Sequence, residues 1–211
     1  MNNTASLSIA EFLDRLSSSD PTPGGGALAA VTGASAAAML AMVGNLTRGR
    51  PKFANVEAEV VQIVEAADHL RQRLLELADA DADAYGSVRA AYRLPHNTEE
   101  EKSARAAAIE SAMHGATDVP VDTATEARAV LELGLRIAQT GNPTVLPDVA
   151  VAAHVAVAAV RSAATQADYN LASITDRTFA NRVEGRLDDV LGGLDALATH
   201  VLEVVETRAT V

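Results

Sequence analysis

The sequence predicts an all-α protein, a multi-helix bundle with two central helices made of small residues. Apolar residues recur with helical spacing almost throughout, and no alternating strand pattern appears. Hydrophobic residues make up 48% of the chain but aromatic residues only 3%, so the apolar content is mostly Ala, Val and Leu. Alanine is a strong helix former. At 211 residues we expect one domain, 1–211, large enough to bury a sizeable core.

Helix start and stop signals divide the chain into segments. Ser8 and Glu11 form the pattern of a capping box, and Thr98 and Glu101 repeat it. Pro120 is suited to the first turn of a helix, where its missing N–H costs nothing. The helices expected from these signals cover residues 8–16, 27–46, 56–93, 98–117, 120–139, 147–170 and 176–207, the last one weakened near Gly192-Gly193.

Two of these helices carry few charges. The run from Pro21 to Thr47 has none, which raises the possibility of a membrane span. Ala and Gly dominate this run while Leu, Ile and Phe are scarce, so a buried helix of a soluble bundle fits better. We therefore expect the helices at 27–46 and 147–162 to be central. Their small faces also suit contact between subunits, and a homodimer is expected.

Charge and residue usage exclude several functions. The formal net charge of −11 argues against binding to nucleic acid or to an anionic membrane surface. The chain has no cysteine, which excludes disulfides, thiol catalysis and cysteine-ligated metal. No two histidines have the spacing of a metal pair on one helix, so we expect no metal. The start of the sequence lacks the pattern of a secretory signal, and we expect a cytoplasmic protein.

A glycine-rich segment is the first candidate binding feature. Pro23-Gly24-Gly25-Gly26 precedes the Ala-rich helix expected from Ala27. A loop feeding a helix N-terminus presents unpaired N–H groups to a carboxylate, a phosphate or a polar ring edge. A flexible connector is the alternative. The segment is neither a Walker loop nor a dinucleotide fingerprint, because the residues that define those motifs are absent.

Asp81 is the first candidate ionisable residue. It lies between Asp79 and Asp83 on the helix expected at 56–93, and residues two apart on a helix project to nearly opposite sides. Its own face continues through Tyr85, Val88 and Tyr92 in the manner of a pocket wall. Spacing alone favours the alternative that all three aspartates are solvated.

Asp148 and Lys52 are the other two candidates. Asp148 opens the second charge-poor helix, where a carboxylate is more often a cap or a partner of the helix dipole than a catalyst. Lys52 follows Arg48 and Arg50 in the turn after the first charge-poor helix. These cations either favour that helix C-terminus or hold a carboxylated ligand.

Taken together, the motifs resemble a known family of folate enzymes. The resemblance runs in order through almost the whole chain and includes residues 21–26, 45–53, 81–85, 94–102, 116–120, 141–142 with 148, and 170–171 with 176–177. These segments are similar to the cyclodeaminase/cyclohydrolase family, which contains the cyclodeaminase half of formiminotransferase-cyclodeaminase and stand-alone bacterial methenyltetrahydrofolate cyclohydrolases. The resemblance implies an all-helical, usually dimeric, metal-free protein without a prosthetic group that binds tetrahydrofolate derivatives.

The resemblance also implies site residues, which are the glycine segment, Lys52, Asp81, Asn142, Asp148 and Asn170. The segments at 45–49 and 97–101 are closer to the stand-alone cyclohydrolases, so hydrolysis of methenyltetrahydrofolate to formyltetrahydrofolate is the expected activity. We expect Asp81 or Asp148 to act as base and Lys52 as proton donor or anchor of the folate carboxylate. The glycine amides and Asn170 would bind the pteridine edge.

Two other functions stay open. Formiminotetrahydrofolate cyclodeaminase would use the same pocket and similar proton transfers. A non-catalytic folate-binding helical dimer is the alternative from another class. It is supported by three departures from the family pattern, because His96 and Pro51 stand where lysines are usual and Gln166 where an asparagine is common. Fewer cations imply a weaker grip on the folate glutamate tail or a different ligand.

Overall fold

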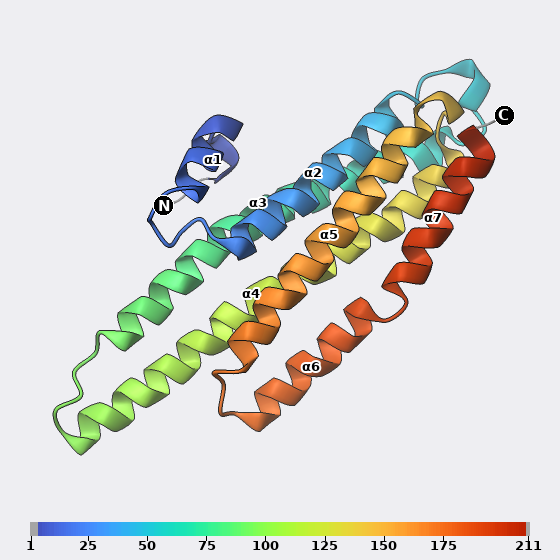
Figure 1. Ribbon diagram of the computed structural model, residues 1–211. Helices are drawn as coiled ribbons and strands as arrows, with labels where there is room; N and C mark the ends of the chain where they lie inside the picture. Colours follow the sequence, from blue (N-terminus) through green and yellow to red (C-terminus); the bar gives the residue numbers. More distant parts are fainter. Residues whose placement is uncertain (1–3, 210–211) are drawn as a thin grey trace.

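The structure is a computed structural model that describes residues 4–209. Helices are the only regular secondary structure among these residues (Figure 1). This confirms the predicted all-α class. The α-helices are α1 Ile9–Leu16, α2 Gly25–Asn45, α3 Glu57–Tyr92, α4 Glu99–Thr140, α5 Leu146–Leu171, α6 Arg177–Leu191 and α7 Leu194–Ala209. Three short 3₁₀ helices cover η1 Thr4–Ser6, η2 Pro51–Phe53 and η3 Pro143–Val145.

Helices α2 to α5 form the central bundle. Each packs against the next in the chain, and α2 closes the ring by packing against α5. Helices α6 and α7 cover α4 and α5, and η1 contacts α3. In Figure 1, α2 and α5 lie side by side along the bundle, and the α3–α4 hairpin extends past the start of α2.

The two charge-poor helices occupy the core, as predicted. In α2, glycines allow close approach: a Cβ on Gly33 would lie 3.2 Å from Leu74 Cδ1, and one on Gly44 would overlap Val64. Both α2 and the segment Pro143–Leu171 are long and apolar enough to cross a membrane, but 61% of the most apolar window of α2 is buried inside the bundle. Its composition therefore matches that of a core helix.

Both predicted capping boxes form. Ser8 Oγ accepts a hydrogen bond from Glu11 N, and Ser8 N donates to Glu11 Oε2 at 2.8 Å. Thr98 and Glu101 make the same reciprocal pair at the start of α4. Local hydrogen bonding thus fixes the N-termini of α1 and α4 at the residues that the sequence indicated.

The prediction of two helices at 98–117 and 120–139 is wrong, because α4 runs unbroken through Pro120. A proline inside a helix has no N–H for the carbonyl four residues earlier, here that of Ala116. Asn170 from α5 replaces it, since its Nδ2 donates to Ala116 O at 2.7 Å. A contact from another helix therefore lets α4 continue where local rules predict a stop.

The predicted single helix at 176–207 is also corrected, because it divides into α6 and α7 at Gly192-Gly193. Gly193 adopts a φ of 67°, which favours glycine. The carbonyls of Val190 and Gly192 accept hydrogen bonds from Arg128 Nη1 at 2.6 and 2.9 Å. The arginine thus caps the end of α6 and holds the bend against α4.

The candidate residues lie at the two ends of the bundle. At the glycine end, the N-terminus of α2 meets the C-terminal part of α5. At the opposite end, the turn after α2 meets the turn before α5, where Asn142 N donates to Thr47 Oγ1 at 2.9 Å. Helices α2 and α5 are thus antiparallel, and every candidate residue belongs to one end or the other.

Candidate functional site

A cavity of about 300 Å³ lies at the glycine end of the bundle. Four helices and the turn before α2 contribute to its wall, which contains polar and apolar side chains in similar proportion. Asp81 is the one charged residue among those that line it. The lining residues are Pro21, Thr22, Gly24, Gly25, Gly26, Asp81, Tyr85, Val88, Met113, Ala116, Gln166 and Asn170.

The triglycine segment is partly helical, so the predicted start of α2 at Ala27 is two residues late. Gly24 is the N-cap, and Gly25 and Gly26 form the first turn. A Cβ on Gly26 would overlap the Asp81 carboxylate, and one on Gly25 would lie 2.8 Å from Gln166 Nε2. Glycine is thus required here because side chains of α3 and α5 close over the first turn of α2.

Asp81 is held at this helix N-terminus. Its Oδ2 accepts a hydrogen bond from Ala27 N at 3.1 Å. The protein's own carboxylate therefore takes one of the N–H groups at this helix N-terminus, and binding of a ligand by the other N–H groups stays a prediction. Burial raises the pKa of the Asp81 carboxyl above its ordinary value, and the hydrogen bond from Ala27 opposes that rise. A carboxylate with a raised pKa in a cavity is suited to proton transfer.

The neighbouring aspartates face elsewhere, as helical spacing predicts. Asp79 accepts hydrogen bonds from the backbone N and the Oγ1 of Thr4, which fastens the N-terminal segment to α3. Asp83 is exposed. The alternative that all three aspartates are solvated is therefore wrong for Asp79 and Asp81, each of which has a defined partner.

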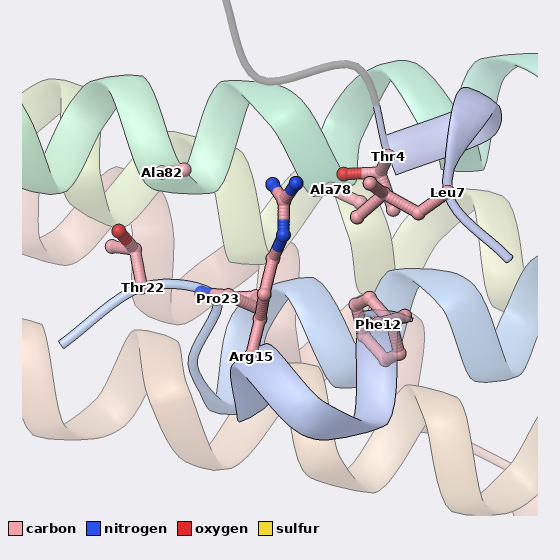
Figure 2. A pocket seen from close by; sticks show the side chains of 8 residues that line it. All are labelled: Thr4, Leu7, Phe12, Arg15, Thr22, Pro23, Ala78 and Ala82. Carbon is pink, nitrogen blue, oxygen red and sulfur yellow. The ribbon is translucent and has the colours of Figure 1, made fainter. Parts of the chain in front are cut away.

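The N-terminal segment supports the glycine turn from outside. A small hollow of about 40 Å³ lies between α1, α3 and the turn. Figure 2 shows Arg15 reaching from α1 toward α3. Phe12 is buried in this contact. Pro23, a predicted binding residue, lines this small hollow and is absent from the wall of the larger cavity. Thr22 contacts both spaces and forms the wall between them.

Asn170 has a structural role as well as a place in the cavity. Its Nδ2 is committed to the Ala116 carbonyl that Pro120 leaves without a partner. The acceptor atom Oδ1 and the second N–H of Nδ2 are then the groups that Asn170 can offer to a ligand. Pro120 and Asn170 thus act together to orient one polar group of the site.

Asn170→Ala is expected to lower the free energy of unfolding by about 1–2 kcal/mol, because it leaves a part-buried carbonyl without a donor. Adding Pro120→Ala supplies a backbone N–H to the same carbonyl and should recover most of that loss. Urea titration of the wild type, both single variants and the double variant measures the coupling. Strictly additive effects of the two substitutions would contradict the assignment.

The remaining predicted residues lie at the opposite end. Lys52 is exposed, with Nζ 5.8 Å from the centroid of the Phe53 ring. Asn142 is buried, and its Oδ1 accepts hydrogen bonds from Thr144 N and Oγ1 at 3.2 and 3.0 Å. Asp148 lies in the first turn of α5 and is separated from Asn170 by about 33 Å of helix.

A single chain therefore does not gather Asp81, Asp148 and Lys52 around one cavity. Asp81 lies with the glycine turn and Asn170, whereas Lys52 and Asp148 flank the contact between Thr47 and Asn142. The roles of these residues in catalysis stay predictions.

Several cavity residues were outside the predicted site. Gln166, singled out only as a departure from the family pattern, lies one helical turn before Asn170 and faces the same cavity. Met113 and Ala116 lie three residues apart on one face of α4. Helical spacing from Asn170 would have found Gln166. No local sequence pattern indicates that Met113 and Ala116 belong to the cavity, because they reach it through the packing of α4 against α5.

Among residues 4–209, no group of three or more His, Cys, Asp or Glu side chains is arranged to hold a metal ion. The absence of a metal from the reaction stays a prediction.

Comparisons with known proteins show the family of this chain. A family model described as formiminotransferase-cyclodeaminase matches residues 8–189. A methenyltetrahydrofolate cyclohydrolase of Methylorubrum extorquens is 42% identical over 200 residues, which cover 95% of this chain and 96% of that protein. The formimidoyltransferase-cyclodeaminase of Rattus norvegicus is 30% identical over 201 residues, 95% of this chain but only 37% of that longer protein.

A solved structure shares the fold. The crystal structure of formiminotetrahydrofolate cyclodeaminase from Thermotoga maritima matches with a TM-score of 0.86 and 30% identity, covering 96% of this chain and 98% of that chain. The family match spans the glycine turn, Asp81 and Asn170. On this evidence of sequence and fold, the chain belongs to the formiminotransferase-cyclodeaminase family.

Proposed function

We propose that the protein is a cytoplasmic enzyme of folate one-carbon metabolism that hydrolyses methenyltetrahydrofolate to formyltetrahydrofolate. The observation that carries this proposal is the cavity with Asp81 as its one charged lining residue. The methenyl substrate is a cyclic amidinium cation, so a lone carboxylate both attracts it and stabilises its charge. The methenyltetrahydrofolate cyclohydrolase from Methylorubrum extorquens, 42% identical, supports the same reaction.

Asp81 is the base in the proposed reaction. Water forms a C–O bond to the bridging carbon, and the proton that the water loses goes to the Asp81 carboxylate. The hydroxyl on that carbon then loses its proton as the bond to one ring nitrogen breaks, and this nitrogen takes up the proton held by Asp81. The carbon remains on the other nitrogen as a formyl group, with one proton released overall. The acceptor oxygen of Asn170 and the amide of Gln166 would bind polar edges of the pterin.

Cyclodeamination is the second candidate function. The Thermotoga maritima structure and the Rattus norvegicus relative carry cyclodeaminase names at 30% identity. That reaction expels ammonia from formiminotetrahydrofolate and closes the ring, and the same carboxylate would stabilise the cation that forms. Because these relatives are less similar to this chain than the Methylorubrum extorquens cyclohydrolase is, we propose hydrolysis as the first candidate.

The two reactions change the methenyl chromophore in opposite directions, which gives the deciding experiment. Purified protein is supplied with each substrate in turn while absorbance is followed. We expect loss of the chromophore from methenyltetrahydrofolate. Its appearance from formiminotetrahydrofolate, without accelerated loss in the first reaction, would establish deamination instead. Folate binding by calorimetry with turnover of neither substrate would favour a non-catalytic binding protein.

We further propose that the protein is a homodimer joined through α2 and α5. The outer surface of α2 carries no charged residue in a chain whose net charge is −11. Leu28 and Met42 on α2 are 42% and 38% exposed, and Val151 on the adjacent α5 is 50% exposed. A second copy of this chain, with the same uncharged surface, is the occupant that such a face suits.

A two-fold axis across the middle of α2 would complete the site. It places the N-terminus of one α2 beside the C-terminus of the partner's, because the helices then run antiparallel. The turn carrying Lys52, together with Asp148 at the same end, would approach the cavity of the other copy. This arrangement explains why residues assigned to one site lie at opposite ends of a single chain.

Mixed dimers test the shared site. Asp81→Asn and Lys52→Ala chains are each expected to be inactive alone. When they are unfolded together and refolded, half of the dimers are mixed, and each mixed dimer has one intact site, so about one quarter of wild-type activity should return. As a control, Asp81→Asn is mixed with a chain carrying both substitutions. Absence of recovery in the first mixture would contradict a site shared between the two chains.

A further inference from the structure

The turn before α2 is a thin partition between two spaces. Thr22 lines both the cavity at the glycine end and the small hollow beside α1. Its neighbours divide between the two spaces, because Pro21 lines the cavity and Pro23 lines the hollow. One thickness of chain therefore separates the hollow from the cavity that contains Asp81.

Packing rather than hydrogen bonding holds this turn in place. Within the described residues 4–209, no hydrogen bond joins the backbone of residues 21–23 to the backbone of another residue. Pro21 and Pro23 have no N–H that could donate one. The position of the turn, and of the first turn of α2 that follows it, therefore depends on the side chains packed behind it.

Phe12 is the main side chain behind the turn. It is 7% exposed and is the one buried residue of α1. Phe12 and Pro23 line the same hollow, whose remaining volume of about 40 Å³ has room for about one water molecule (Figure 2). The ring thus fills space that water would otherwise occupy.

The other wall of the hollow belongs to the helix that carries Asp81. Ala78 and Ala82 of α3 line the hollow, and they lie three residues before and one residue after Asp81. The hollow therefore borders the helical turn from which Asp81 projects. Methyl groups are too short to screen that carboxylate, so exclusion of water depends on the larger side chains of Leu7 and Phe12, which line the same space.

We propose that Phe12 is a positioning residue for Asp81, because it seals the hollow behind the glycine turn and keeps the first turn of α2 against the Asp81 carboxylate. The inference rests on the proposed role of Asp81 as base. It gives the N-terminal segment a part in the reaction, although none of the described residues from Thr4 to Leu16 lines the cavity.

The seal acts on Asp81 through hydration rather than through charge. Tyr85 is the other titratable residue that lines the cavity, Arg15 is the charged residue that lines the hollow, and Asp79 accepts its hydrogen bonds from η1. Phe12→Ala leaves all these groups in place. Because burial raises the pKa of the Asp81 carboxyl, admitting water should lower that pKa toward its ordinary value.

The test is a direct titration of Asp81. Carbon-13 NMR of protein labelled in aspartate follows each side-chain carboxyl with pH, and the signal of Asp81 is the one that Asp81→Asn lacks. In Phe12→Ala we expect its pKa to fall by about half a unit or more. Phe12→Leu keeps a bulky apolar group and should retain most of the wild-type value. Leu7→Ala opens the same hollow and should shift the pKa downward as well.

Leu13→Ala is the matched control, since Leu13 follows Phe12 on α1 but is 52% exposed and lines neither space. An unchanged or raised pKa in Phe12→Ala and Leu7→Ala would overturn the inference, and so would an equal fall in Leu13→Ala. Thermal unfolding checks that each variant is folded, and Leu7→Ala decides the outcome if Phe12→Ala is not.

The titration needs no substrate, so its result is separate from that of the proposed hydrolysis. A fall in the NMR pKa supports the seal even if no turnover is found. Where turnover is found, the acid limb of kcat/KM should move to lower pH together with the NMR pKa. A limb that stays in place while the NMR pKa falls would remove Asp81 as the base, and with it the positioning role of Phe12.

Discussion

Asp81→Asn is expected to lower the turnover of methenyltetrahydrofolate by about a hundred- to ten-thousand-fold, the usual effect of losing a general base. The amide can still accept the hydrogen bond from Ala27, so the first turn of α2 should keep its geometry. Steady-state kinetics on the chromophore measures the loss. Asp83→Asn is the matched control, because that neighbouring carboxylate is exposed and lies outside the cavity wall. Full activity in Asp81→Asn would end the assignment of Asp81 as base.

Although Asp81→Asn should lower turnover, it should not lower the stability of the folded protein. Burial raises the pKa of Asp81 in the folded protein, so the folded state binds this proton more tightly than the unfolded state. The ionised carboxyl therefore costs stability once the pH exceeds its unfolded pKa, and this cost is fully present above the folded pKa. At pH 7 the asparagine variant should be as stable as the wild type or more so.

The same shift sets the pH dependence of the wild type. Only ionised Asp81 accepts a proton, so kcat/KM should fall as the pH is lowered. Because burial raises the pKa of Asp81, this fall should occur at a higher pH than for an ordinary aspartate, whose pKa is about 3.9. A pH profile of kcat/KM measures this limb. Its persistence in the residual activity of Asp81→Asn would assign it to another group.

Gly26→Ala is expected to reduce activity by about a hundredfold or more, because its methyl group would overlap the Asp81 carboxylate and displace the base. Overpacking of this kind also costs about 1–3 kcal/mol of unfolding free energy. Kinetics and urea titration measure the two effects. Gly185→Ala on α6 is the control, since a Cβ there meets nothing within 4 Å and should instead stabilise the helix.

A double variant separates displacement of Asp81 from general disruption of the site. If Gly26→Ala acts by moving Asp81, then adding it to Asp81→Asn should lower turnover little further. Multiplicative losses in the double variant would show that the glycine has a separate role.

Local rules predicted the helices well where their causes are local. The capping boxes at Ser8 and Thr98 and the helical face of Asp81 depend on residues within a few positions of one another, and the structure contains them. The stop predicted at Pro120 failed because its remedy comes from Asn170, on a helix that the sequence does not place beside it. Long-range partners of this kind are invisible to spacing rules.

The residues of the site, like the helices, could be predicted only in part from the sequence. The glycine segment, Asp81 and Asn170 do meet in one cavity, as the family resemblance implies. Two of the three glycines have a reason that the sequence did not indicate, because Gln166 and Asp81 occupy the space that a Cβ on Gly25 or Gly26 would need. Lys52 and Asp148 lie at the opposite end of the bundle. The order of residues in the sequence does not indicate which helix ends lie together in the fold, so this separation could not be predicted.

A crystal structure of the Asp81→Asn variant with methenyltetrahydrofolate bound gives the most direct test of the proposed chemistry. We predict that the bridging carbon lies about 3–4 Å from the side chain at position 81, or one water molecule away, at the N-terminus of α2. A pterin bound elsewhere, with position 81 facing an empty cavity, would contradict the account.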